Sequence, residues 1–410
     1  MSAKTLTKKW TQCIHMKNYN FKKAAFFSLT FLTATMAYAK PEPNPIVTDS
    51  GIAIIPFLNA STGYNDNLAK ADNDLESSHY LVLEPGVTVA FEPVGQKHII
   101  AYRLQRGDFF SSSKDDFTDH FFDLSSDWEL NSKHRLNLNY SLALTHESRG
   151  DNDETLDLLY NKYNSNNLNL GYGYGGIEAK GRVETNIGWG DLDYKNNKNR
   201  TQYQDWDELR FNTAFYYKAL PKTSLLIQFI ANDRNYDLVA PNSTQRDSKH
   251  YFAYVGASWD ATGKLRGNAK IGAQHKNFDS AEREDFDSFS WDIDLTYLVK
   301  SYSAVQLKTN RRSTDPDGVG DAIDTKIYDI NWSHNWSKII STKADVSLLS
   351  EDYTGSSRKD DTTNVTLSFN YDFRRWLTFK LGYGLESKDS NINQFSYDQN
   401  IYYFAIEGVM

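Results

Sequence analysis

The sequence predicts an all-β fold, a transmembrane antiparallel up-and-down β-barrel of about 18 strands. Three observations lead to this prediction. Many segments of about ten residues alternate strictly between apolar and polar side chains, as a strand with one apolar face does. Tight turns and longer polar connections alternate between these segments. No run of about 18 apolar residues offers a membrane-spanning helix.

The composition agrees with one repetitive unit rather than several domains. The 410 residues include 9 prolines and 26 tyrosines, aromatic residues make up 14% of the chain, and the mean hydropathy is −0.62. The chain is therefore polar overall and rich in residues that favour strands.

Residues 1–39 are predicted to be an upstream extension followed by a secretory signal peptide. The basic stretch "MKNYNFKK" (16–23) precedes the apolar stretch "AAFFSLTFLTATM", and "AYAK" supplies a cleavage site after Ala39. We expect translation to start at Met16, because a signal peptide begins close to its basic region. A retained membrane anchor is the less favoured alternative, since the apolar stretch is too short to span a bilayer.

Cleavage of this signal changes the cysteine count and the net charge. Cys13, the sole cysteine, lies in the removed part, so the mature chain is expected to hold no thiol and no disulfide. Six lysines also leave, so that 39 basic residues face 53 acidic ones and the net charge is near −14. An acidic mature chain argues against nucleic acid as a partner.

Residues 40–51 are expected to form a short periplasmic segment, and residues 52–410 the barrel. Each predicted strand is long enough to cross a bilayer when tilted, and an even number of strands suits a closed antiparallel barrel. The predicted strands are 52–64, 79–92, 96–106, 119–131, 134–147, 162–175, 177–190, 203–217, 222–236, 248–260, 264–278, 286–298, 302–312, 324–336, 339–352, 362–373, 376–388 and 395–407.

The segment "WLTFKLGYGLE" (376–386) shows how these strands are expected to be buried. Its odd positions, Leu381 among them, form an apolar face, while its even positions, such as Lys380, are mostly polar or glycine. Strands of this kind with no helix to cover them can bury their apolar faces only against each other or in lipid. The charged opposite faces cannot form a sandwich core, so a barrel in lipid is favoured over a soluble sandwich or solenoid.

The connections predict how the barrel is oriented. Short turns such as "EPVGQ", "ALPK" and "ATGK" follow the even-numbered predicted strands, and longer polar segments such as 65–78, 191–204 and 354–362 follow the odd-numbered ones. Short turns face the periplasm and long loops face outward in bacterial barrels, so both chain ends are expected in the periplasm. Aromatic residues near strand ends fit interfacial girdles: Trp189, Trp259, Trp336, Trp376 and Tyr402.

The alternation also predicts which side chains line the lumen. A barrel of this size leaves an aqueous channel unless something plugs it, and too few residues precede the first strand to form an N-terminal plug. We therefore expect a wide hydrophilic passage of mixed charge. The candidate path residues are Arg103, Lys180, Arg182, Arg210, Lys270, Asp294, Lys308, Lys380, Gly382, Gly384 and Glu386.

Catalytic and metal-binding patterns are weak. The histidines of the mature chain are scattered without metal-ligand spacing or a nucleophile beside them, so surface or girdle positions are expected. "DPDGVGD" (315–321) has calcium-like carboxylate spacing but lacks the bidentate acid of a complete loop, so an ordinary acidic outer loop is favoured. No catalytic residue, metal or cofactor is predicted.

Two stretches resemble a known family. "GYNDNL" (63–68) and the closing run "YDFRRWLTFKLGYGLESKDSNINQFSYDQNIYYFAIEG" (371–408) are similar to the putative beta-barrel porin 2 family. That family has a "YDDN"-like element, an aromatic-Arg turn, a strand ending in "RDS" and a "YDxN" opening of the last strand. Lys388 stands here in place of the Arg of "RDS", and the chain ends "FAIEGVM" without the terminal aromatic residue common in outer-membrane barrels.

The resemblance implies an outer-membrane porin of a Gram-negative bacterium that serves export of a capsular or secreted polysaccharide. It implies as partners the outer-membrane lipids, the polysaccharide, a periplasmic or outer-membrane polysaccharide export protein, and the outer-membrane barrel assembly machinery. A general or small-solute diffusion porin, an outer-membrane enzyme such as a lipase or protease, and an adhesive surface barrel remain alternatives. The sequence favours the non-enzymatic readings.

Overall fold

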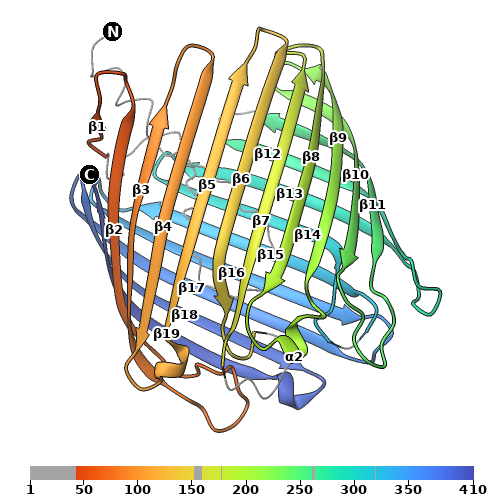
Figure 1. Cartoon of the computed structure of the whole chain (residues 1–410). Helices are drawn as coiled ribbons and strands as arrows, with labels where there is room; N and C mark the ends of the chain where they lie inside the picture. The colour runs from red at the N-terminus through yellow and green to blue at the C-terminus, as the bar shows by residue number, and fades with distance from the viewer. Residues whose placement is uncertain (1–42, 152–158, 177, 261–263, 319) are drawn as a thin grey trace.

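The computed structural model describes residues 43–151, 159–176, 178–260, 264–318 and 320–410. Over these residues the chain forms a barrel of long tilted strands, with both ends of the described chain at one end of the barrel (Figure 1). The predicted signal peptide, residues 1–39 with Met16, lies outside the described residues.

Most of the described chain is strand. The strands are β1 (Ile46–Val47), β2 (Ala53–Asn65), β3 (Ser78–Phe91), β4 (Gln96–Phe109), β5 (Phe117–Glu129), β6 (His134–Glu147), β7 (Asn161–Tyr174), β8 (Gly181–Tyr194), β9 (Trp206–Leu220), β10 (Thr223–Tyr236), β11 (Ser248–Asp260), β12 (Leu265–Phe278), β13 (Phe286–Lys300), β14 (Ser303–Thr314), β15 (Ile323–Asn335), β16 (Ile340–Tyr353), β17 (Lys359–Arg374), β18 (Leu377–Ser390) and β19 (Tyr397–Val409). Short helical turns, η1 (Ser113–Asp115), α2 (Lys198–Thr201) and η2 (Asn393–Phe395), lie in the longer loops.

The strands close into a ring. Each of β2 to β19 pairs antiparallel with its neighbours in sequence, and β19 pairs with β2 from Ile401 opposite Asn65 to Val409 opposite Phe57. The short β1 adds to the start of β2, where Ile46 lies opposite Ile54. Closure leaves no open sheet edge in the 18-stranded wall, which lipid requires because it offers no hydrogen-bond partner to a free backbone group.

The predicted strand order and count are confirmed, and most boundaries agree within three residues. The largest shift is in β8, which runs from Gly181 to Tyr194 rather than over 177–190. The preceding turn is longer than predicted and contains Gly175 at a φ of 97°, in the left-handed region that favours glycine.

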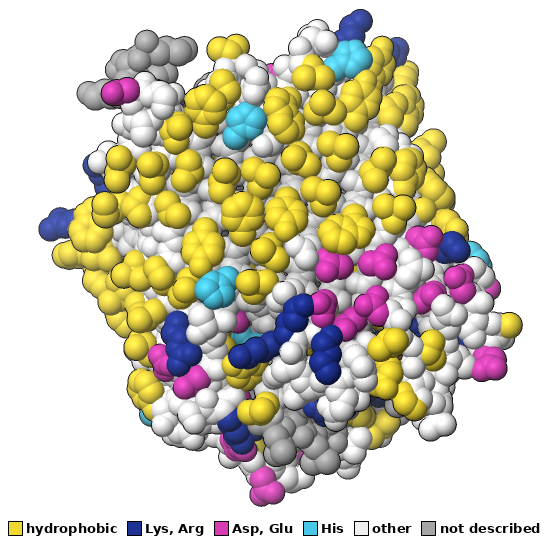
Figure 2. All heavy atoms as spheres, viewed as in Figure 1, with side chains coloured by type: hydrophobic (Ala, Val, Ile, Leu, Met, Phe, Trp, Pro, Cys, Tyr) yellow, Lys and Arg dark blue, Asp and Glu magenta, His cyan; other side chains and the backbone are white. Residues whose placement is uncertain are grey.

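One face of the wall meets lipid. Leu381 on β18 is 62% exposed, and Ile227, Val255 and Leu168 on other strands are also exposed, although a water-soluble protein would bury such side chains. Figure 2 shows apolar side chains covering the middle of the outer surface, with acidic and basic side chains gathered toward the loop end. This is the outward-facing apolar band of a transmembrane barrel.

Aromatic residues and histidines mark the turn end of this band. Trp336 and Trp376 lie in short turns and Trp259 lies one residue before the end of β11, as expected for a girdle. The His334 ring lies 4.2 Å from the Trp336 ring, and such amphipathic rings suit the boundary between lipid and water. Trp189 and Tyr402 lie within β8 and β19 rather than at their ends.

Short turns and long loops lie at opposite ends of the barrel. The turns share one end with β1 and the C-terminus, while η1, α2 and η2 share the other end (Figure 1). In bacterial barrels such turns face the periplasm and such loops face outward, and we assign the two ends of this barrel accordingly. No helix in the described part of the chain is long and apolar enough to span a membrane.

Candidate transport path

The interior of the barrel is lined by the strand faces opposite the lipid face. Because successive side chains alternate, the exposed apolar positions of each strand fix which of its residues point inward. By this criterion ten of the predicted path residues face the lumen: Arg103, Arg182, Arg210, Lys270, Asp294, Lys308, Lys380, Gly382, Gly384 and Glu386.

The prediction for Lys180 needs correction. Lys180 precedes β8 and is exposed in the periplasmic turn, and its Nζ lies 5.7 Å from the ring centre of Tyr217. Tyr217 belongs to the lipid-facing side of β9. The predicted strand began four residues too early, so the alternation was extended into a turn where it does not hold.

Two arginines of the path stack on aromatic rings. The guanidinium carbon of Arg103 lies 4.1 Å from the Phe121 ring centre, and that of Arg182 lies 3.9 Å from the Tyr216 ring centre. Arg103 is 39% exposed and its Nη1 lies 3.5 Å from an oxygen of Glu84. Stacking holds each guanidinium flat and leaves edge donors for other partners.

Polar side chains on neighbouring strands share hydrogen bonds at mid-height. Arg210 bonds to Asn167 on β7 and donates to the Trp189 carbonyl oxygen at 3.2 Å. Lys270 donates to Asp292 at 2.9 Å and to Gln228 at 3.1 Å. These bonds join β7 to β9 and β10 to β13.

A second polar group lies between β13 and β14. Asp294 accepts a bond of 2.7 Å from Gln306, and Lys308 lies directly opposite Asp294 in the strand register. The path at this height therefore carries both charge signs within a few ångströms, as the sequence predicted.

Lys380 and Glu386 point inward but are not free. Lys380 is buried and donates to Glu407 of β19 at 2.8 Å. Glu386 is buried too, and accepts a bond of 2.9 Å from Lys70 in the loop after β2. Neither side chain is offered to open water in the lumen.

Gly382 seats an aromatic ring instead of widening the passage. A Cβ atom at Gly382 would lie 2.1 Å from Cζ of Tyr403, so the ring of Tyr403 lies directly over the glycine. Phe57 on β2 lies over Gly86 on β3 in the same way, since a Cβ atom at Gly86 would lie 2.2 Å from Cζ of Phe57. We call these two arrangements the ring-on-glycine pairs, and in each a ring lies against the lumen wall over a glycine.

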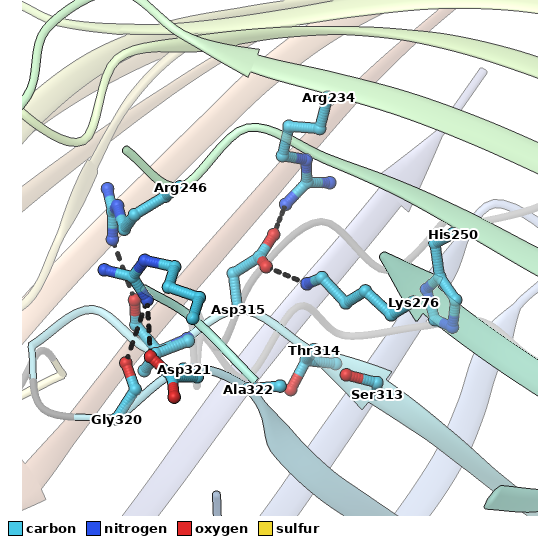
Figure 3. A network of polar contacts seen from close by, with 12 residues as sticks. Arg234, Arg246, His250, Lys276, Ser313, Thr314, Asp315, Gly320, Asp321 and Ala322 are labelled. Carbon is cyan, nitrogen blue, oxygen red and sulfur yellow. Dashed lines mark hydrogen bonds and ion pairs between the residues drawn. The ribbon is translucent and has the colours of Figure 1, made fainter. Parts of the chain in front are cut away.

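An outer loop folds into the mouth of the barrel. Asp315, in the loop after β14, lies 2.5 Å from Arg234 on β10, four strands away, and also pairs with Lys276 on β12 (Figure 3). Arg246 donates to the Pro316 carbonyl oxygen at 3.0 Å. Because Arg234 and Lys276 are inward-facing, this loop runs along the inside of the wall.

A second inward fold joins three loops. Lys70 pairs with Asp151 at 2.8 Å as well as with Glu386. Beside it, Arg149 pairs with Asp115 at 2.7 Å and with Glu76 at 2.8 Å. The loops after β2, β4 and β6 are therefore tied to one another and to the wall of β18, so that loop segments line the inside of the outer mouth. The expected wide passage stays a prediction.

These ion pairs shift the pKa values of loop residues. Burial opposes the charge of Asp315, but Lys276 and Arg234 hold its pKa well below the usual range. Hydrogen bonds from Arg149 and Lys114 lower the pKa of Glu76 to about 2. Burial would lower the pKa of Lys70, yet Asp151 and Glu386 raise it well above the usual value. All three groups stay charged at neutral pH.

The carboxylates of Asp315 and Asp321 in the segment "DPDGVGD" pair with cationic side chains. Besides the pairs of Asp315, Asp321 accepts a bond of 3.1 Å from Arg283. The described residues contain no cluster of three or more metal-ligating side chains. The segment lies in an outer loop, as the sequence favoured, and its ion pairs anchor it to the wall.

Sequence reasoning missed the inward loops and their partners. Asp315 and Arg234 are 81 residues apart, and Lys70 and Glu386 are 316 apart, so no local period links them. The one available sign was the number of charged residues at the loop-side ends of inward strand faces, such as Lys276 and Asp360, where desolvation demands partners.

The closed strand ring, the lipid-facing band and the polar interior define an outer-membrane β-barrel of the porin class, located in the outer membrane of a Gram-negative bacterium. The chain belongs to the putative beta-barrel porin 2 family, whose family model matches residues 52–408. The resemblance found in the sequence is therefore confirmed over most of the chain.

Several solved structures are similar in fold. The outer membrane protein OpdK of Pseudomonas aeruginosa is 10% identical, with 87% of this chain and 99% of that chain covered and a TM-score of 0.48. OccAB3 of Acinetobacter baumannii is 9% identical, with 87% and 99% covered and a TM-score of 0.46. The FrpB iron transporter of Neisseria meningitidis is 10% identical, with 82% and 63% covered and a TM-score of 0.48. The comparison with curated proteins gives no match.

Proposed function

We propose that this porin exports a capsular or secreted polysaccharide, acidic or neutral, through its polar lumen. The observation that carries the proposal is the chemistry of two lumen walls. The inward faces of β7 and β17 lie about half way round the barrel from each other. Their uncharged hydrogen-bonding positions are Ser165, Asn167 and Asn169 on β7, and Thr362, Asn364, Thr366, Ser368 and Asn370 on β17. Of these, Asn169, Asn364 and Thr366 are partly exposed, and the other five are buried within the wall.

Hydroxyl and amide groups both donate and accept hydrogen bonds, which matches the hydroxyl groups of sugars. Such bonds are individually weak in water, so a chain can exchange them as it advances. Of the ring-on-glycine pairs, Tyr403 is buried, but Phe57 is partly exposed and adds aromatic surface on which the apolar face of a sugar ring can rest. A polymer would thus find repeated weak contacts along the wall rather than one tight site.

The proposal includes partners. We expect the barrel to receive the polymer from a periplasmic or outer-membrane polysaccharide export protein at its turn end, to sit among outer-membrane lipids, and to be inserted by the barrel assembly machinery. It involves no catalytic residue, since polymer conduction needs no bond to be made or broken.

A small-solute diffusion porin is the second candidate, and one observation favours it. The loops anchored by Asp315 and Lys70 narrow the outer mouth. A narrowed mouth admits small molecules more readily than a polymer. Export therefore requires that these loops move outward or that the polymer fits in the space beside them.

Gene deletion with two matched tryptophan variants tests the proposal. Thr366 points into the lumen opposite Gly384, and Thr363 points to the lipid face of the same strand. We expect deletion to leave polymer synthesis intact but to lower surface polysaccharide, and Thr363→Trp to restore it. Thr366→Trp, at equal abundance in the outer membrane, should not. Normal surface polysaccharide in the deletion strain, with impaired uptake of small solutes, would favour the diffusion porin.

A further inference from the structure

The two mouths of the barrel differ in charge. The nine outer loops contain twenty acidic and nine basic residues, whereas the eight periplasmic turns contain two acidic residues, Glu92 and Glu178. The basic residues of these turns are Lys133, Lys180, Lys222, Lys264, Lys338 and Arg375. The periplasmic turns are therefore basic, although the predicted mature chain is strongly acidic.

The cations at the two mouths also differ in how they are paired. Most outer-loop cations have a carboxylate partner: Lys70 with Asp151, Arg149 with Asp115, and Arg283 with Asp321. The two charges of such an ion pair largely cancel, so the pair exerts little net attraction on a third charged group.

At the periplasmic mouth, several exposed cations make no ion pair with any described residue. Five of them make no ring contact either, Lys133, Lys222, Lys300, Lys338 and Arg375, and we call these five the basic rim. They come from five different turns or strand ends distributed around the barrel. Lys300, Lys338 and Arg375 lie at successive turns, two strands or about 10 Å apart, which is close to the Debye length at physiological salt, so their fields overlap. Lys133, Lys222 and Lys300 are four strands apart, about 20 Å, and extend the basic rim around the mouth.

The basic character continues from the rim into the lumen. Arg266 near the start of β12 is exposed on the inward face and forms no ion pair within the described chain. Lys308 follows farther along on β14. Arg182 and Lys270 also lie along this path, but each is paired, Arg182 with Glu184 at 3.0 Å and Lys270 with Asp292 at 2.9 Å. A ligand attracted by the rim would thus meet Arg266 and then Lys308 as it enters.

We propose that the basic rim is a collecting site for a polyanionic polymer, one that carries carboxylate, sulfate or phosphate groups along its length. A ring of separated single charges matches a chain of repeated anionic groups, and fields of this kind raise the rate of encounter. The acidic outer loops repel the same polymer, which disfavours return through the outer mouth. This inference rests on the proposed export function, and assigns an acidic polymer to it.

Single-channel recording tests the inference, with polygalacturonate as the anionic probe and dextran of similar length as the neutral probe. The full-length mature barrel is reconstituted in a bilayer of neutral phosphatidylcholine, so that anionic lipid does not compete for the rim. Biotin on a Glu284→Cys variant, which lies in an outer loop, identifies the outer side through streptavidin addition.

We expect polygalacturonate to block the current about tenfold more often from the periplasmic side than from the outer side at 0.1 M salt. The difference should vanish at about 1 M salt because of screening. A triple variant, Lys133→Gln, Lys222→Gln and Lys338→Gln, should lower the periplasmic blocking rate several-fold and leave dextran unaffected. The matched control, Lys114→Gln, Lys195→Gln and Lys198→Gln, removes three charges from outer loops and should retain that rate.

Equal blocking from both sides, or a rate unchanged in the rim variant, would overturn the collecting site, and is the outcome expected if the rim docks an acidic protein instead. The export function is tested separately, by whether polymer passes through the barrel to the other side of the bilayer. If dextran passes but polygalacturonate is not favoured, export stands and the collecting site fails. If polygalacturonate blocks at the rim but no polymer passes, the collecting site stands and export fails.

Discussion

The carboxylate of Asp315 lies 2.5 Å from the guanidinium of Arg234, although the two residues belong to elements four strands apart in the barrel wall. Both side chains are largely buried, and Lys276 adds a second cation to the same carboxylate. A contact of this reach can form only if the loop after β14 turns into the barrel. It makes this loop a determinant of the width of the outer mouth.

Removal of the Asp315 charge is expected to free that loop. Asp315→Asn keeps the shape but leaves buried cations with one partner fewer, and breaking a buried ion pair costs about 3 to 5 kcal/mol. Because a loop can open locally, we expect higher single-channel conductance with little loss of barrel stability. Glu284→Gln, in an exposed outer loop, is the control. Unchanged conductance in Asp315→Asn would show that the loop does not limit the passage.

The pair of Lys70 and Glu386 should behave as a coupled unit. Both side chains are buried, so Glu386→Gln alone leaves a buried ammonium with Asp151 as its remaining acidic partner and should lower stability by up to about 3 kcal/mol. The double variant with Lys70→Met should cost less than the sum of the single ones. Heat-dependent unfolding in detergent gels measures all three proteins, and additive effects would contradict the contact.

Acid should release the loops. The pKa of Glu76 is lowered to about 2, and that of Asp315 is also below its usual value, so each group binds fewer protons folded than unfolded. Their stabilisation is then complete above the unfolded pKa of about 4 and is lost as pH falls toward the folded value. We expect steady conductance from pH 8 to 5 and an increase below about pH 4. A change centred near pH 6.5 would point to histidine instead.

The lipid face is tested by placing one charge on either side of the wall. Leu381→Arg puts a cation where the side chain is 62% exposed to lipid, at a cost of about 2 to 4 kcal/mol near the bilayer midplane. Thr366→Arg puts the same group into the lumen, where Gly384 lies opposite. Only Leu381→Arg should reduce insertion, as measured by the amount of heat-resistant barrel in outer membranes. Equal loss in both variants would contradict the assigned faces.

The strand pattern was predictable because period-two alternation is local. Leu381 and Lys380 could be assigned to opposite faces from a single strand, and the structure agrees. Lys180 was misplaced because side chains in a turn do not alternate between two faces. The sequence pattern did not show that the turn begins at Gly175, whose positive φ ends the alternation. The alternation placed Gly382 in the lumen, but the ring of Tyr403 over it depends on the register between β18 and β19.

The inward loops were beyond local reasoning for a different reason. The carboxylate that pairs with Arg234 is set by the path of the loop after β14 inside the barrel. Several other acidic loops could have supplied the partner. The sequence shows only that charged residues at the loop-side ends of inward strand faces need partners. Their identity is decided by closure of the whole barrel.

Release of polymer from liposomes tests the central claim most directly. Liposomes containing the purified barrel would be loaded with a labelled polysaccharide, and release would be followed beside permeation of a small sugar. The account predicts that polymer leaves through the wild-type barrel, and that Thr366→Trp slows polymer more than small sugar while Thr363→Trp slows neither. Rapid permeation of the small sugar with complete retention of the polymer, in wild type and in the loop-released Asp315→Asn alike, would contradict polysaccharide export.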